Sequence, residues 1–225
     1  MLERVLEPEV MDTEEEAAEY AAIDPNEASR LFVDEAIAFS PEARRILDMG
    51  TGPAHIPIMI ARRLPSAQIT AIDLAEHMLI VARRNVAQAD LSGRILLERR
   101  DVKKTEYSES QFDFVISSAI IHHIPRPVEI FAEIRRFAAS GAAVYLKDLA
   151  RPETSEKLEE LVTRYAGKHT SYQRQLFRQS LHAALTPAEI LSACAEAGLD
   201  KVEVGFCSDR HWALRRTAAK PSLRS

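Results

Sequence analysis

Segments with strand and helix patterns alternate along the middle of the chain, and this order constrains the fold more than any other feature. Five short apolar runs are predicted as strands, at residues 44–50, 68–74, 94–100, 112–117 and 142–148. Segments with helical spacing separate most of them, at residues 54–64, 76–89 and 127–139. Strands joined by right-handed helical crossovers run parallel and carry helices on both faces of the sheet. The pattern therefore predicts an α/β chain with a doubly wound, mostly parallel sheet.

The chain after residue 150 predicts three more helices and a pair of short strands. The helices are expected at 155–166, at 172–184 and from Thr186 to Gly198, and the strands at 201–207 and 211–217. Thr186 and Glu189 have the spacing of a capping box, with proline in the first turn, which marks a helix start. The two strands are expected to pair as an antiparallel hairpin at one edge of the sheet.

The first forty residues have helical patterns and precede the first strand. Residues 13–16 have the sequence of a capping box, and residues 26–39 continue with helical spacing. A chain of 225 residues is long enough for one domain with a full core and short for two. We therefore expect a single domain over residues 1–225. Its parts are an N-terminal helical cap at 1–40, a central core at 41–150, and helices with a C-terminal hairpin at 151–217.

Composition and charge argue against several classes of function. The formal charge of −5 and the pI near 5.9 predict no clustered basic face, so a nucleic-acid partner is disfavoured. Cys194 and Cys207 have no metal-ligand spacing and are expected to be small buried side chains without a catalytic role. No cluster of His, Asp and Glu has ligand spacing, so we expect no metal site. The sequence shows no signal peptide and no apolar run of membrane-spanning length, which predicts a cytoplasmic protein.

Two glycines lie between the first strand and the following helix, in the stretch ILDMGTGPAHIPIMIA at residues 46–61. Gly50 and Gly52 therefore occupy a loop that can hold a ligand. The dinucleotide-binding fingerprint needs a third glycine, which lets helix and strand pack closely, but His55 stands at that position. The pattern disfavours NAD and favours a Gly-x-Gly-x-small loop that ends at Ala54.

At this loop the chain resembles the class I S-adenosylmethionine-dependent methyltransferases. Their first motif is an acidic residue followed by Gly-x-Gly-x-Gly, and here it is matched by Asp48, Gly50, Gly52 and Ala54, with alanine in place of the last glycine. The resemblance covers about residues 44–150. It implies a Rossmann-like sheet of seven strands, S-adenosylmethionine as cofactor, and S-adenosylhomocysteine as product. The stretch from the fourth to the fifth strand is similar to the small-molecule branch that includes quinone-type C-methyltransferases.

The resemblance also assigns cofactor-binding residues at the ends of the later strands. Asp73 closes the second strand, where a carboxylate accepts hydrogen bonds from both ribose hydroxyls. Asp101 and the backbone amide of Val102 match the position that binds the adenine edge. Ser117 follows the fourth strand near the methionine part of the cofactor. From its place at the start of a helix, Met78 is a further candidate, either to touch the adenine or to fill the core. All these strand ends lie at the edge of an open α/β sheet where ligands bind.

Two adjacent histidines, His122 and His123, lie just past the fourth strand, beside the expected sulfonium. Methyl transfer is an in-line displacement, so much of the catalysis comes from positioning, and a base is optional. An imidazole has a pKa suited to taking a proton from an acceptor. One hypothesis is therefore that a histidine of this pair faces a small-molecule acceptor. The alternative is that both histidines hydrogen-bond the backbone of the loop before Pro125.

Other side chains are candidates with equally simple structural alternatives. Tyr20 is a candidate to cover the cofactor or to pack in the core. The side chains of Arg174, Arg178 and His182 share one helix face, which is either solvated or lines the pocket. Trp212 is expected to pack in the core rather than to stack on a ligand.

Rival functions stay open on the sequence alone. An NAD-dependent oxidoreductase would use the same loop, and a non-catalytic module would bind S-adenosylmethionine without transferring its methyl group. A methyltransferase acting on protein or RNA is disfavoured, because Ser117 and Ser118 stand where such enzymes carry an Asn/Asp-Pro-Pro-aromatic motif. No motif identifies the acceptor or the oligomeric state.

Overall fold

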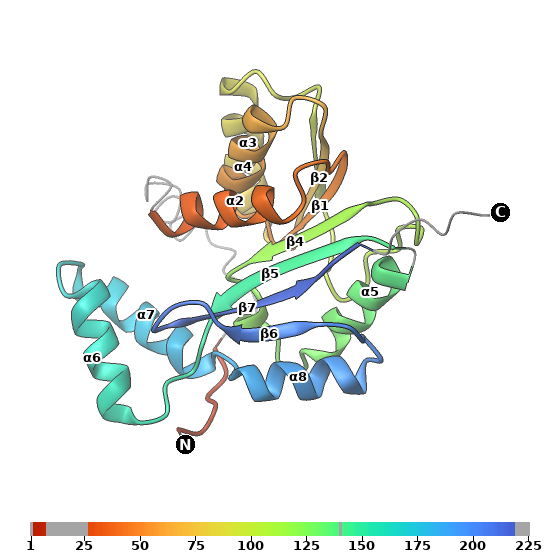
Figure 1. Ribbon diagram of the computed structural model, residues 1–225. Coiled ribbons are helices and arrows are strands. Elements are labelled where there is room, and N and C mark those ends of the chain that lie inside the picture. The colour runs from red at the N-terminus through yellow and green to blue at the C-terminus, as the bar shows by residue number, and fades with distance from the viewer. Residues whose placement is uncertain (1, 8–26, 140, 219–225) are drawn as a thin grey trace.

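A single mixed sheet forms the centre of the molecule. The computed structural model describes residues 2–7, 27–139 and 141–218, and within these residues seven strands pair in the order β3-β2-β1-β4-β5-β7-β6 (Figure 1). The strands are β1 (Arg45–Met49), β2 (Gln68–Asp73), β3 (Ile95–Arg99), β4 (Phe114–Ser118), β5 (Ala143–Leu149), β6 (Glu203–Phe206) and β7 (His211–Arg216). The first five are parallel, and β7 runs antiparallel to both β5 and β6. The prediction of a mostly parallel sheet with an antiparallel C-terminal hairpin is confirmed.

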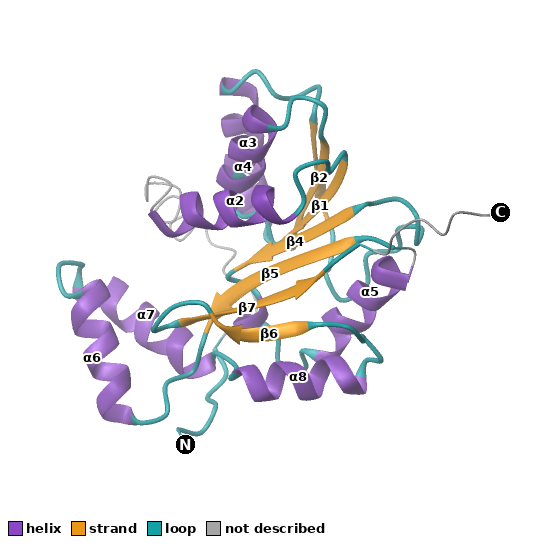
Figure 2. Cartoon of the chain, in the orientation of Figure 1, coloured by secondary structure: helices purple, strands orange, loops and turns teal. Residues whose placement is uncertain are grey.

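Helices cover both faces of the sheet, as Figure 2 shows. One face packs against α2 (Glu27–Phe39), α3 (His55–Arg63) and α4 (Glu76–Gln88), and the other against α5 (Val128–Ala139) and α8 (Pro187–Glu196). Each of these helices was expected within a few residues of its observed position. None of those described is long and apolar enough to cross a membrane.

The core consists of two apolar layers, one on each side of the sheet. Successive residues of a strand point to opposite faces, so Ile46 packs with α2 and α3 while Leu47 packs with α5 and α8. Every residue of β5 is buried. Trp212 on β7 is fully buried in the layer under α5 and α8, which confirms its predicted place in the core. Cys194 lies in the same layer, and burial raises the pKa of its thiol to about 12.

Three further elements lie near the carboxyl ends of β4 and β5. These are a short 3-10 helix, η1 (Ile121–His123), and two helices that pack on each other, α6 (Ser155–Ala166) and α7 (Ser171–Ala183). Helix α7 also packs against η1. The two helices were predicted from their spacing, whereas η1 was not, because a single turn has too few residues to show a period.

The N-terminal segment, residues 2–7, crosses back to this end of the molecule. It is not helical, so the expected helical cap does not include it. The backbone amide of Leu2 donates to the carbonyl of Glu153 at 2.8 Å, and that of Val5 donates to the carbonyl of His182 at 3.2 Å. Residues 8–26, which contain the predicted capping box and Tyr20, lie outside the described residues.

Candidate active site

A cavity of about 440 Å³ opens at the carboxyl ends of the parallel strands. It lies where the strand order reverses, between β1 and β4, which is the usual ligand-binding position in open α/β sheets. Its volume is in the range of small-molecule sites. Of the predicted cofactor-binding residues, those that line the cavity are Gly50, Gly52, Asp73, Met78, Asp101 and Val102. The fold therefore brings six dispersed residues of the sequence to one surface.

The backbone of the glycine loop has a conformation that disfavours any residue with a side chain. Gly50 has φ of +80° and Gly52 has φ of +52°, in the left-handed region that glycine adopts without strain. A Cβ atom added at Gly50 would also overlap the side chain of Ile120. Ala54, which stands in place of the last glycine of the Gly-x-Gly-x-Gly motif, is likewise left-handed with φ of +64° and fully buried. The loop thus keeps the shape of a three-glycine turn, with local strain at the alanine.

Two acidic side chains line the cavity from neighbouring strands. The Asp73 carboxylate at the end of β2 accepts the backbone amide of Gly52 at 2.7 Å and that of Ala75 at 2.9 Å. Asp101, which follows β3, accepts the backbone amide of Lys103 at 2.9 Å and pairs with its ammonium group at 3.0 Å. Asp73 therefore fixes the glycine loop and also presents negative charge to the cavity.

Asp48 and Ser117 lie one layer deeper than expected. Both are buried and absent from the lining among the described residues. Burial raises the pKa of Asp48 to about 7, and the charge of Asp73 acts in the same direction. The Ser117 hydroxyl donates to the carbonyl of Met49 at 2.8 Å, so its neighbour Ser118 reaches the cavity instead. The difference follows from the alternation of strand side chains between the two faces.

His122 is buried at the edge of the cavity and is held by Asp148 at the end of β5. The Nδ1 atom of His122 lies 2.5 Å from Oδ1 of Asp148. The same carboxylate accepts the backbone amides of Ile121 at 2.6 Å, His122 at 3.1 Å and Leu149 at 2.6 Å. Burial alone would lower the pKa of His122, but Asp148 raises it above its ordinary value. In return, His122 and the backbone donors outweigh burial and hold the pKa of Asp148 below its usual range.

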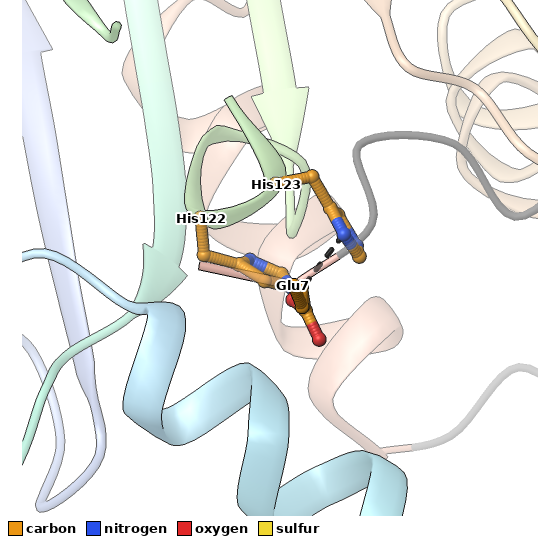
Figure 3. Close-up of side chains that lie close together, drawn as sticks. All are labelled: Glu7, His122 and His123. Atoms are coloured by element: carbon orange, nitrogen blue, oxygen red, sulfur yellow. Dashed lines mark ion pairs between the residues drawn. The ribbon is translucent and has the colours of Figure 1, made fainter. Parts of the chain in front are cut away.

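Glu7 reaches the histidine pair from the N-terminal segment. Its Oε1 atom lies 3.4 Å from Nε2 of His122 and 3.2 Å from Nδ1 of His123, and the three side chains converge in Figure 3. Its Oε2 atom accepts the hydroxyl of Ser180 at 3.2 Å. Burial raises the pKa of Glu7. We call Glu7, His122 and His123 the Glu7 cluster; its two histidines line the cavity.

The sequence did not point to Glu7 or Asp148 as site residues. Glu7 is brought to the histidines by a segment with no secondary structure, and Asp148 lies near the end of a strand without belonging to any motif. Helix α7 contributes Phe177 and Ser180 to the cavity. The helix face with Arg174, Arg178 and His182 does not line it. Arg178 pairs with Glu159, with its two hydrogen bonds at 2.6 Å and 2.7 Å on the surface, as the solvated alternative predicts.

Comparison with known proteins places the chain in a family. A family model described as a methyltransferase domain matches residues 41–198. Malonyl-[acyl-carrier protein] O-methyltransferase of Geobacter sulfurreducens is 30% identical over 185 residues, which cover 82% of this chain and 66% of that protein. A release factor glutamine methyltransferase of Bacteroides thetaiotaomicron is 32% identical over 95 residues, 42% of this chain and 34% of that protein. The matches thus span from about a third to two thirds of these relatives.

Solved structures share the fold at low sequence identity. The phosphoethanolamine N-methyltransferase 2 of Haemonchus contortus, in complex with phosphomonomethylethanolamine and S-adenosylhomocysteine, superposes with a TM-score of 0.68 at 18% identity, over 91% of this chain and 58% of that one. An S-adenosylmethionine-dependent methyltransferase of Aquifex aeolicus gives 0.64 at 17% identity, over 91% and 98%. Since the family model covers most of the sequence, the chain belongs to the methyltransferase-domain family, as its resemblance to class I S-adenosylmethionine-dependent methyltransferases predicted.

Proposed function

We propose that this protein transfers a methyl group from S-adenosylmethionine to a small molecule bound in the cavity. The observation that carries the proposal is the gathering of the glycine loop, Asp73 and Asp101 around one cavity at the switch point of the sheet. Asp73 would accept the ribose hydroxyls, and Asp101 with the amide of Val102 would hold the adenine. The sulfonium cofactor carries positive charge, which suits a site with two carboxylates on its surface.

Two features of this chain match the shape of that cofactor. At Gly50 a side chain is excluded, so the loop backbone is left bare toward the cavity. Met78 and Val102 add apolar surface to the same cavity, which suits the face of an adenine ring. When bound, S-adenosylmethionine supplies an activated methyl group on sulfur. The residues of the chain have to hold the acceptor in line with that group and keep water away.

The acceptor is expected beside the histidine pair. His122, His123, Phe177 and Ser180 line the cavity there. Imidazole nitrogens suit an acceptor that gives up a proton, and Asp148 fixes the ring of His122 through its Nδ1 atom. His122 and His123 are therefore the proposed catalytic side chains.

The share of this chain that each relative matches supports a small-molecule acceptor for the methyl group. The relatives that act on release factor or tRNA match 32% to 52% of this chain, whereas malonyl-[acyl-carrier protein] O-methyltransferase matches 82%. A UbiE ubiquinone/menaquinone C-methyltransferase of Geotalea daltonii matches 55% at 27% identity. The formal charge of −5 adds no attraction to tRNA.

Calorimetric titration with S-adenosylhomocysteine tests the cofactor. We expect micromolar binding that weakens by about tenfold to a hundredfold in Asp73→Ala, because both ribose contacts and the anchor of the glycine loop are lost. Asp200→Ala, an exposed carboxylate far from the cavity, serves as the control and should bind normally. NADH binding without S-adenosylhomocysteine binding would contradict the proposal and favour an oxidoreductase.

The substitution Gly50→Ala should weaken cofactor binding at the same site. Gly50→Ala forces a non-glycine residue to φ of +80° and pushes its Cβ into Ile120. We expect S-adenosylhomocysteine to bind about tenfold more weakly, or worse, since left-handed strain and loop displacement each cost on the order of 1–3 kcal/mol. Gly93→Ala is the matched control, because an added Cβ there meets no atom within 4 Å. Equal cofactor affinity in the two variants would show that the loop does not contact the cofactor.

A further inference from the structure

We propose that Glu7, His122 and His123 bind a divalent transition-metal ion at the edge of the cavity. Two imidazoles and a carboxylate form a ligand set that suits ions such as Zn²⁺ and Co²⁺, whereas Mg²⁺ and Ca²⁺ prefer sites made only of oxygen. The sequence predicted no metal site because the three residues have no ligand spacing. The fold brings a ligand from the N-terminal segment to the two histidines of η1.

The distances within the Glu7 cluster are those of ligands that share one ion. One possible ligand atom from each side chain lies within 4.8 Å of the other two. Glu7 Oε1 is 3.4 Å from His122 Nε2 and 3.2 Å from His123 Nδ1. Two ligands held about 2.1 Å from an ion at the tetrahedral angle lie about 3.4 Å apart. The two measured separations agree with this value, so an ion fits between these atoms with small movements.

Asp148 directs a nitrogen lone pair of His122 into the cluster. An ionised carboxylate only accepts hydrogen bonds, and Asp148 already accepts three backbone amides. The Nδ1 atom of His122, 2.5 Å away, therefore carries a proton, and Nε2 on the side of Glu7 is the nitrogen left to bind an ion. A carboxylate behind a ligating histidine is the usual outer partner in metal sites, where it fixes the ring and strengthens the ligand.

The carboxylate of Glu7 is the second independent sign of a cation. Its side chain is only 8% exposed, and Oε1 makes no well-aligned hydrogen bond with any part of the chain that the structure describes. Burying a carboxylate oxygen without a partner is costly. This oxygen also lies 3.4 Å from Nε2 of His122, and once Nε2 has lost its proton the two electron-rich atoms repel unless a metal ion lies between them. An ion in the Glu7 cluster removes both costs.

The N-terminal segment holds Glu7 in place before any ion binds. The Arg4 guanidinium donates to the carbonyls of His122 and Ile124, both at 3.0 Å, and to that of Ala183 at 2.6 Å. Arg151 donates to the carbonyl of Leu2 at 2.9 Å. These contacts tie the segment to η1 and α7, so the carboxylate and the imidazoles form a preorganised ligand set rather than a chance meeting of mobile side chains.

The position of the site gives the ion a role, which rests on the proposed function. The histidines line the cavity, so three protein ligands leave a coordination position for an acceptor, as in catalytic zinc sites. With an ion bound, the two imidazoles act as its ligands rather than as bases, and an oxygen or sulfur atom bound to the ion loses its proton more readily. The acceptor class is then a hydroxyl, thiol or enol that can coordinate a metal, rather than an amine or an unactivated carbon.

Cobalt binding to the whole 225-residue chain tests the site. After treatment with a chelator, the protein is titrated with Co²⁺ and followed by visible absorption and by calorimetry, with Mg²⁺ in a parallel titration. We expect one Co²⁺ per chain with micromolar or tighter affinity, displacement by Zn²⁺, and no comparable binding of Mg²⁺. Failure to bind Co²⁺ at this level would overturn the proposal. It would mean that shared protons, and not a metal ion, hold the side chains of the Glu7 cluster together.

Matched variants locate the ion. Glu7→Gln and His123→Gln should each weaken Co²⁺ binding by about tenfold or more. The controls are Glu3→Gln, an exposed carboxylate of the same segment, and His169→Gln, an exposed imidazole after α6; both should bind Co²⁺ normally. Circular dichroism shows whether each variant is folded, and unchanged Co²⁺ affinity in a folded Glu7→Gln protein would overturn the proposal.

The cofactor titration separates this proposal from the proposed function. Glu7→Gln should bind S-adenosylhomocysteine as the unchanged protein does, because Glu7 lies at the histidine pair and not at the glycine loop. S-adenosylhomocysteine binding without Co²⁺ binding rejects the metal and leaves the methyltransferase proposal intact. Co²⁺ binding that depends on Glu7 without S-adenosylhomocysteine binding supports the metal site and rejects the proposed cofactor.

Discussion

Asp148→Ala is expected to lower the free energy of unfolding by about 3–5 kcal/mol, as found when one partner of a buried charged pair is removed. The change leaves the imidazole of His122 without its buried partner. It also leaves three backbone amides without an acceptor, those of Ile121, His122 and Leu149. Each buried donor left unpaired costs on the order of 1–3 kcal/mol, so the effect comes from several contacts at one carboxylate.

Urea denaturation at neutral pH measures this loss. Asp113→Ala is the matched control, because Asp113 also accepts two backbone amides, those of Arg44 and Arg45, but its side chain is 38% exposed. Water can replace that carboxylate, so a much smaller loss is expected. Asp148→Asn should fall between the two, since the amide oxygen still accepts some of the backbone donors. A similar loss of stability in Asp148→Ala and Asp113→Ala would contradict the assigned role.

Four aspartates at or near the carboxyl ends of the strands lie in three different environments. Asp48 in β1 is buried beneath the glycine loop, Asp73 ends β2, Asp101 follows β3, and Asp148 lies near the end of β5. Asp73 and Asp101 face the cavity, Asp148 fixes a histidine, and Asp48 has a buried oxygen with no partner among the described residues. One edge of the sheet thus combines charge for a cationic cofactor with the support of the proposed catalytic histidine.

The sequence predicted the sheet because its signals are local. Each buried strand is a short apolar run between turn signals, and each helix shows its own period and cap, so neither needs the rest of the chain to be identified. The same holds for Gly50 and Gly52, whose loop is set by adjacent residues. Ser117 shows the limit of this reasoning, because an error of one residue along a strand exchanges the two faces. The structure therefore places Ser118 at the cavity.

The histidine side of the cavity depends on contacts that a local pattern does not contain. His122 and His123 were predicted to lie near the acceptor from their place after β4, but their partners, Glu7 and Asp148, come from other parts of the chain. Glu7 is held by the hydrogen bonds of Arg4 to backbone carbonyls, which any sequence at those positions could offer. A carboxylate that long-range packing brings to a histidine leaves no spacing to detect, which is why no metal site was expected.

Asp48→Asn is expected to make the protein more stable at neutral and alkaline pH. Burial raises the pKa of Asp48 from its ordinary value of 3.8 to about 7 in the folded protein. Between these values the native state keeps a proton that the unfolded chain has released, so the free energy of unfolding falls by about 1.4 kcal/mol per pH unit. The decline ends above pH 7, after a total of about 4 kcal/mol. Asparagine does not titrate and removes this decline.

Urea unfolding across a pH series from about 4 to 8 measures the effect, which is read from the slope with pH. The difference between Asp48→Asn and the unchanged protein should be smallest near pH 4, grow through pH 7 and then stay constant. Burying the new amide hydrogens lowers the free energy of unfolding of Asp48→Asn by on the order of 1–3 kcal/mol at every pH, so it does not change the slope with pH. Asp34→Asn, an exposed partner of Arg63, is the control. Parallel stability curves for Asp48→Asn and the unchanged protein would mean that Asp48 is already ionised in the fold. The cost of burying that charge would then be met by a partner near the glycine loop.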